Sequence, residues 1–112
     1  MCHTPPLYTS NALTPVQGFT IPSEDRARYQ IIDRVVGTDP ALALRTRKGT
    51  GYYKVPSLKG AWYRGRLQHS GAAGSLEEWF DRGRRSRIPG HRFGLDLSPA
   101  DRRSLIAFLR TL

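Results

Sequence analysis

Eight prolines and eleven glycines in 112 residues constrain the fold of this chain more than any other feature of its sequence. Both residue types favour turns, and proline also removes a backbone donor and interrupts helices. Pro5, Pro6, Pro15 and Pro22 exclude a helix across residues 1–22, which we expect to form an extended loop. Only 25 residues are Leu, Ile, Val or Phe, so the supply of apolar mass for a core is thin. The sequence therefore predicts a loop-rich chain with few long elements and no strand pattern longer than a few residues.

Two segments in the body of the chain are predicted to be helical. Residues 23–36 begin with two acidic side chains, which suit a helix N-terminus, and they carry an apolar edge before Gly37 can end the helix. The sequence Ser75-Leu-Glu-Glu78 is a capping box, which predicts a short helix through Phe80. The segments expected to be loops are the basic, glycine-containing residues 45–51 and the arginine-rich residues 82–94.

The clearest helix signal lies in residues 98–112. Ser98 is an N-cap residue, a proline follows at the first helical position, and Asp101 places a negative charge in the first turn. An apolar stripe then recurs at helical spacing, formed by Leu105, Phe108, Leu109 and Leu112. This face needs a packing partner, and we expect it to be partly exposed or covered by the loops of residues 5–22.

The charge balance and the cysteine count limit the classes of function. Eighteen Lys and Arg against nine Asp and Glu give a net charge of +9, so the chain is expected to seek anionic partners. A single cysteine excludes an internal disulfide. No secretory signal and no membrane span is visible in the sequence. The length accommodates one domain, which we expect to occupy residues 1–112.

The dipeptide Cys2-His3 matches the end of the motif C-x-x-C-H, which attaches haem covalently. In that motif two thiols bond the haem vinyl groups and the histidine ligates the iron. The dipeptide alone is a weak signal, because a thiol beside an imidazole near a chain end is also an ordinary surface feature. A haem would, however, supply the large apolar surface that the chain itself lacks. The one cysteine and three histidines match no common zinc pattern.

Four sequence segments follow the dipeptide in a fixed order. They are Lys54-Val-Pro-Ser-Leu-Lys-Gly60 with Trp62-Tyr-Arg-Gly65, then His69-Ser-Gly71, then Ser75-Leu-Glu-Glu-Trp-Phe80, and finally the stretch from Phe93 to Leu112. In this order they resemble the C-terminal half of bacterial c-type cytochrome domains, and above all those related to the di-haem cytochrome c peroxidases. The resemblance extends over nearly the whole chain.

The resemblance implies a mostly α, loop-rich cytochrome c-like domain around one covalently bound haem c. In it, Cys2 would be the second attachment cysteine and His3 the proximal iron ligand. The first attachment cysteine and the N-terminal helix of the family have no counterpart, so we expect a single truncated domain from a longer parent protein. The parent is expected to be periplasmic, although this chain carries no signal peptide.

The second axial ligand departs from the pattern of the family. Methionine is the usual sixth ligand of an electron-transfer haem, but the only methionine, Met1, adjoins the attachment site and cannot reach the distal face. The remaining imidazoles are His69 and His91, each of which can also be an ordinary loop residue. His69 is favoured, because the family places its glycine-flanked turn near the haem pocket. The residues expected to bind the haem carboxylates are Lys54, Lys59, Trp62 and Arg64.

The sequence thus predicts an electron-transfer module that belongs to a larger periplasmic cytochrome or peroxidase-like protein. It is not expected to be a complete enzyme, because a peroxidase needs an open distal position and usually a second haem. Its expected partners are an acidic redox protein or the rest of the parent chain. The alternative is a small basic protein without haem that binds nucleic acid or docks a partner, nucleic acid being the less favoured. A third alternative is a fragment that does not fold.

Overall fold

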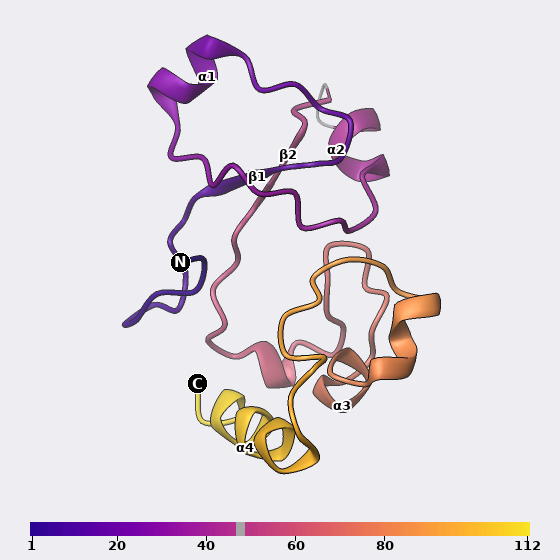
Figure 1. The fold of residues 1–112 in the computed structure, drawn as a ribbon. Helices are drawn as coiled ribbons and strands as arrows, with labels where there is room; N and C mark the ends of the chain where they lie inside the picture. Colours follow the sequence, from indigo (N-terminus) through magenta and orange to yellow (C-terminus); the bar gives the residue numbers. More distant parts are fainter. Residues whose placement is uncertain (47–48) are drawn as a thin grey trace. The chain divides into compact units, whose positions relative to one another are not determined.

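The computed structural model describes residues 1–46 and 49–112, so residues 47–48 of the predicted loop at 45–51 lie outside the described part. The chain divides into two compact units, residues 1–57 and residues 58–112 (Figure 1). Among the described residues, no helix combines the length and the apolar character needed to cross a membrane. The elements are, in chain order, β1 (Leu13–Pro15), α1 (Ser23–Arg28), α2 (Ala41–Arg45), β2 (Tyr52–Lys54), the 3-10 helix η1 (Ala61–Tyr63), α3 (Leu76–Trp79), the 3-10 helix η2 (Arg82–Ser86) and α4 (Pro99–Leu109).

The prediction of a mostly α fold like that of cytochrome c is wrong. The helices are short, the longest in the described part being α4 with 11 residues, and the first unit contains an antiparallel strand pair. Nine glycines adopt positive φ values, a backbone conformation that interrupts a helix. The described chain is therefore of mixed α and β structure, with most of its length in loops and turns.

A small sheet organises the first unit. Strands β1 and β2 pair antiparallel, with Leu13 opposite Lys54 and Pro15 opposite Tyr52. Pro15 is tolerated because it ends a short strand in a sheet of only two strands. Ile31 forms a further parallel bridge with Leu13. Three extended segments from distant parts of the sequence are thus hydrogen-bonded together, and α1 and α2 lie in the stretches of chain that connect them (Figure 1).

The helix predicted for residues 23–36 ends far earlier than expected. Helix α1 covers only Ser23–Arg28, and Tyr29 is already extended, with φ −123° and ψ 147°. The residues that follow are rich in β-branched side chains, which lose rotamer freedom in a helix and favour extended backbone. Their apolar side chains do not form a helix face, and Ile31 instead forms a bridge with Leu13 of β1.

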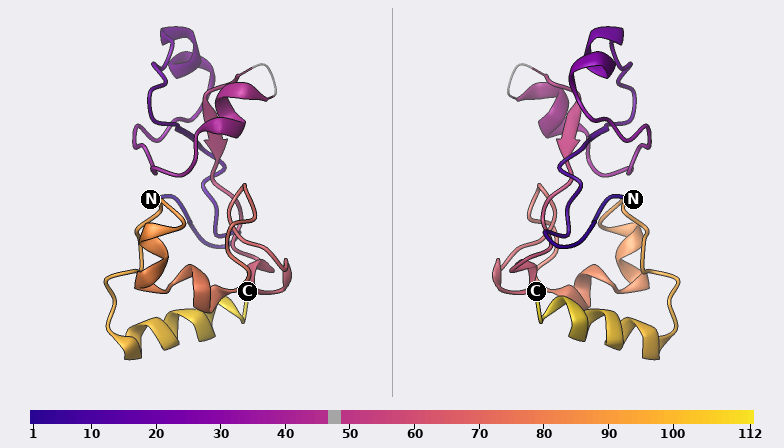
Figure 2. Two further views of the ribbon diagram at one scale, coloured as in Figure 1. Left: turned by 90° about the vertical axis from the view of Figure 1, so that its right-hand side faces the viewer. Right: turned by 90° about the vertical axis from the view of Figure 1, so that its left-hand side faces the viewer.

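The second unit has the clearest apolar core. Leu76 and Phe80, in and directly after α3, pack with Ile106 and Leu109 of α4. Figure 2 shows α4 lying beside α3. The predicted helix at residues 98–112 is confirmed, but its buried face is centred on Ile106 and Leu109, whereas Phe108 is 45% exposed. Leu76 and Phe80 pack against this face, and the predicted stripe is partly exposed, which is one of the two outcomes expected from the sequence.

Local capping explains where these two helices begin. The Oγ of Ser75 accepts a hydrogen bond from the backbone N–H of Glu78 at 3.1 Å, as the capping box predicts. The carboxylate of Glu78 reaches back to the N–H of Gly74 at 2.7 Å. The Oγ of Ser98 accepts from the N–H of Asp101 at 3.1 Å. Both predicted helix starts are therefore confirmed at the level of single hydrogen bonds.

Tyr52 connects β2 to α1 in the first unit. Its hydroxyl donates to Oδ2 of Asp25 at 2.8 Å, and its ring packs edge-on against Phe19 with the centroids 5.0 Å apart. Burial and, after it, the hydrogen bond to the carboxylate raise the pKa of Tyr52 from 10.0 to about 12. The neutral phenol is therefore the form that the folded unit favours.

We expect this phenol to make stability depend on alkaline pH. Because the pKa is higher in the folded chain, the contribution of Tyr52 is fully present below pH 10.0 and is lost as the pH rises to about 12. Titration of tyrosinate absorbance should show a late-ionising component that disappears in Tyr52→Phe and remains in Tyr29→Phe. A late component that survives in Tyr52→Phe would show that another tyrosine carries it.

Candidate functional site

The dipeptide Cys2-His3 lies in a loop that its own backbone closes. The N–H of Ser10 donates to the carbonyl oxygen of Cys2 at 2.7 Å. The Oγ1 of Thr9 donates to the carbonyl of Val55, directly after β2, at 2.6 Å. Prolines within the loop cannot donate, so side-chain bonds take the place of a backbone ladder. The loop is thereby tied to the strand pair of the first unit.

The imidazole of His3 is oriented by the backbone of Tyr8. Its Nδ1 lies 3.1 Å from the carbonyl oxygen of Tyr8. A carbonyl can only accept, so Nδ1 carries the proton, and in the neutral ring the lone pair then belongs to Nε2. Tyr8 adopts φ 53°, a left-handed turn conformation, where this contact is made. A bond of this kind, from one ring nitrogen to a backbone carbonyl, is how metal-ligating histidines commonly fix their tautomer.

Cys2 provides a free, half-buried thiol next to this ring. The dipeptide therefore combines one thiol and one tautomer-fixed imidazole, which is the donor set of thioether attachment beside an axial ligand. Among the described residues, no group of three or more His, Cys, Asp or Glu side chains is placed to hold a metal ion. Cys2 and His3 supply one of the two thiols and the histidine of the C-x-x-C-H motif.

The other predicted site residues are divided between the two units. Lys54 is an exposed residue of β2 in the first unit. Lys59, Trp62 and Arg64 belong to the second unit, around η1, where Nη2 of Arg64 donates to the carbonyl of Lys59 at 2.9 Å. Within the units, the structure thus brings Cys2 together with His3, and Lys59 together with Arg64.

The two remaining histidines have different surroundings within the second unit. His69 is exposed in a tight turn in which the N–H of Gly71 donates to the carbonyl of Gln68 at 3.0 Å. The ring of His91 packs against Trp79 and Phe93, with centroid distances of 5.3 Å to each. His91 is therefore part of an aromatic cluster rather than the solvated loop residue that the sequence indicated.

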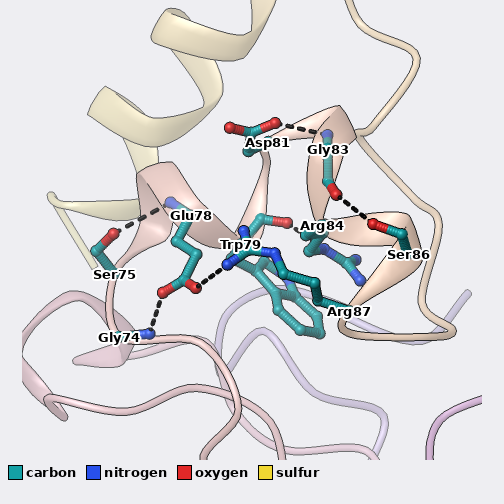
Figure 3. A network of polar contacts seen from close by, with 9 residues as sticks. All are labelled: Gly74, Ser75, Glu78, Trp79, Asp81, Gly83, Arg84, Ser86 and Arg87. Atoms are coloured by element: carbon teal, nitrogen blue, oxygen red, sulfur yellow. Dashed lines mark hydrogen bonds and ion pairs between the residues drawn. The ribbon is translucent and has the colours of Figure 1, made fainter.

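Arg84 is the residue that sequence reasoning missed. Its side chain is fully buried, with 0% of its surface exposed, although it lies in a run that looked like solvated charge. The guanidinium carbon lies 4.0 Å from the centroid of the Trp79 ring (Figure 3). The guanidinium donates to four backbone carbonyls, those of Trp79 at 2.5 Å, Ile88 at 2.9 Å, Gly90 at 3.1 Å and His91 at 2.6 Å.

The electrostatic setting of Arg84 follows from this burial. Desolvation lowers the pKa of Arg84 below its usual value, and the neighbouring charge of Arg85 lowers it further. The planar fork of arginine suits this place, because it directs several donors at once to fixed acceptors. Nothing in the sequence distinguishes Arg84 from the arginines beside it, and only the convergence of the carbonyls from residues 79–91 selects it.

Comparison with known proteins identified no relative of this chain. No protein-family model, no curated protein and no solved structure matches the chain. The candidate site therefore stands on the geometry of its own residues.

Replacing Arg84 by lysine should destabilise the second unit strongly. Lysine keeps the charge but not the fork, and each carbonyl left without a donor costs about 1–3 kcal/mol. We expect Arg84→Lys to lower the free energy of unfolding by at least about 2 kcal/mol in urea denaturation followed by tryptophan fluorescence. The matched control is Arg85→Lys, which can keep the exposed ion pair with Asp96 and should change stability by less than about 0.5 kcal/mol. Equal stability of both variants would contradict the role given to Arg84.

Proposed function

We propose that this chain is a haem c-binding electron-transfer module in which Cys2 forms the thioether and His3 ligates the iron. The observation that carries the proposal is the hydrogen bond from Nδ1 of His3 to the carbonyl of Tyr8. It assigns the lone pair to Nε2, which is the nitrogen that an iron would need. The thiol of Cys2 is the adjacent residue, in the order that the attachment motif requires.

The chemistry of attachment needs only groups that this chain and the cofactor supply. Cys2 would hold the group through a thioether, its S–H adding across a vinyl double bond so that sulfur bonds one carbon and the hydrogen the other, with no oxidant consumed. The bound group would supply the ferrous–ferric couple, while the protein sets its potential through ligand and burial. The hydrogen bond to Tyr8 holds the orientation of the His3 ring.

Exposed apolar side chains in the first unit also support a large apolar ligand. Leu7 is 58% exposed, Tyr29 51% and Val35 49%. An apolar cofactor that contacted these side chains would remove their apolar surface from water. A chain with so thin a core is expected to gain stability when an apolar cofactor covers such side chains.

The remaining parts of the haem hypothesis stay predictions. They are the periplasmic location of the parent protein, its relation to di-haem peroxidases, and the binding of the haem carboxylates by Lys54, Lys59, Trp62 and Arg64. The second candidate function is the binding of nucleic acid by a haem-free basic protein, which exposed aromatic residues near arginines favour. Colour separates the two candidates, because only the first gives a red protein with a haem absorption spectrum.

We expect covalent haem on this chain when it is produced with a haem-attachment machinery and extended so that a cysteine stands three positions before Cys2, completing C-x-x-C-H. Haem staining of a denaturing gel measures the covalent bond, and the absorption spectrum measures ligation. His3→Ala should abolish the low-spin spectrum, whereas Cys2→Ala should lose a thioether but keep His3 ligation. The matched control His91→Ala keeps the attachment motif intact. An unstained, colourless extended chain that is nevertheless folded would refute the proposed function.

The second axial ligand is expected to be an imidazole or water rather than a methionine. The haem-loaded chain should show no methionine-to-iron charge-transfer band, and bis-imidazole ligation should lower the reduction potential relative to histidine–methionine ligation. His69→Ala and His91→Ala test the two imidazoles that the sequence offers, and loss of the low-spin spectrum in one variant alone would identify its ring as the ligand. No change in either variant would exclude both.

A further inference from the structure

The arginine-rich run after α3 is largely occupied by contacts inside the second unit. Arg84 is buried. The guanidinium of Arg85 lies 2.5 Å from the carboxylate of Asp96, and that of Arg87 lies 3.9 Å from the carboxylate of Glu78. The densest charge in the sequence is therefore partly neutralised by neighbours, which makes it a weak anchor for an external anion.

A second group of basic residues surrounds η1, and it lies in a stretch without carboxylates. The sequence contains no Asp or Glu between Asp39 and Glu77, so residues 58–76 of the second unit carry positive charge only. Three of these side chains are exposed cations next to two aromatic rings. We call this group the η1 surface; its members are Lys59, Trp62, Tyr63, Arg64 and Arg66.

The two aromatic rings of the η1 surface are unusually open to solvent. Trp62 is 54% exposed and Tyr63 is 73% exposed, and their ring centroids lie 5.7 Å apart. Trp, Tyr and Arg are the residue types that contribute most to protein–protein binding energy. Adjacent exposed aromatics with a charged rim indicate an interaction site.

Backbone and side-chain contacts hold the η1 surface in place. The N–H of Gly60 donates to the carbonyl of Leu112 at 3.1 Å, which ties η1 to the segment after α4. The N–H of Tyr63 donates to the carbonyl of Gly60 at 3.2 Å. A Cβ on Gly60 would lie 3.2 Å from the ring of Tyr63, so this ring lies over the glycine. A surface ordered in advance loses little entropy when a partner binds.

We propose that the η1 surface docks a protein segment that alternates carboxylates with apolar side chains. Carboxylates pair with the guanidinium groups of Arg64 and Arg66, and the apolar side chains pack on the aromatic pair. The rings of Trp62 and Tyr63 are tilted by 56° to each other, so they do not form the parallel platform that a continuous stack of bases would use. The interaction goes beyond the proposed function, because it requires no haem, and it assigns to Lys59, Trp62 and Arg64 a role other than the predicted binding of the haem carboxylates.

The test measures the binding of a labelled peptide, in which glutamate alternates with leucine, to the whole chain by fluorescence anisotropy. The probe controls are the same peptide with glutamine in place of glutamate and a single-stranded oligothymidylate of equal charge. The double variant Arg64→Gln/Arg66→Gln is compared with Arg85→Gln/Arg87→Gln, which removes the same charge from the same unit. Circular dichroism verifies that each variant keeps the secondary structure of the parent chain.

We expect Arg64→Gln/Arg66→Gln to weaken binding of the acidic peptide about tenfold, with the Arg85→Gln/Arg87→Gln variant within about twofold of the parent chain. Trp62→Ala should weaken it by a similar factor, and Phe108→Ala, an exposed aromatic residue of α4, should not. Equal losses in the two arginine pairs would show diffuse charge attraction and overturn the proposal. Tighter binding of oligothymidylate through the same residues would assign the surface to nucleic acid and overturn it as well. Because no haem is present in this assay, its outcome is independent of whether Cys2 and His3 bind one.

Discussion

The second unit depends on a cation that is buried among backbone carbonyls. Removing a guanidinium from water costs several kcal/mol, and Arg84 recovers this through hydrogen bonds to carbonyls and a contact with the face of Trp79. Each hydrogen bond to a charged group contributes about 1.5–3 kcal/mol, so four of them offset a penalty of this size. The segment after α3 has few apolar residues of its own, and the guanidinium is what gives its carbonyls a common partner.

In the first unit, hydroxyl groups supply the hydrogen-bond donors that the backbone carbonyls need. Its strands are only three residues long, so most backbone carbonyls lie outside the ladder and need other donors. The Oγ1 of Thr14 donates to the carbonyl of Tyr53 at 3.2 Å, and the hydroxyl of Tyr53 donates to the carbonyl of Asp39 at 2.6 Å. The Oγ1 of Thr9 likewise donates a hydrogen bond to the carbonyl of Val55. Side-chain donors therefore replace the regular hydrogen bonding that prolines and glycines interrupt.

Sequence reasoning succeeded where a structure is decided within a few residues. The caps at Ser75 and Ser98 are local, because the side chain, the accepted N–H and the first turn all lie within four positions. It failed where distant segments meet: the pairing of Leu13 with Lys54 leaves no periodic signal in strands of three residues. For the same reason residues 29–36 were expected to be helical, since their apolar spacing suits both a short helix edge and a bridge to β1.

The candidate site, like the fold, could be predicted from the sequence only in part. Cys2 and His3 were identified from their adjacent positions in the sequence. The hydrogen bond from the His3 ring to the carbonyl of Tyr8 was not, because every residue has a backbone carbonyl and the sequence does not show which one accepts. The burial of Arg84 was equally invisible, since three of its four acceptors are carbonyls of residues that the sequence assigned to loop.

The distribution of charge shows why composition is a poor guide to where a partner binds. A net charge of +9 counts every arginine alike, yet Arg84 is buried and Arg85 lies against Asp96. An external anion must compete with such internal partners before it gains anything from these groups. It meets no such competition from sequence neighbours around η1, where a long stretch lacks carboxylates. Attraction at long range depends on the total charge, but the place of binding depends on which cations stay exposed beside aromatic surface.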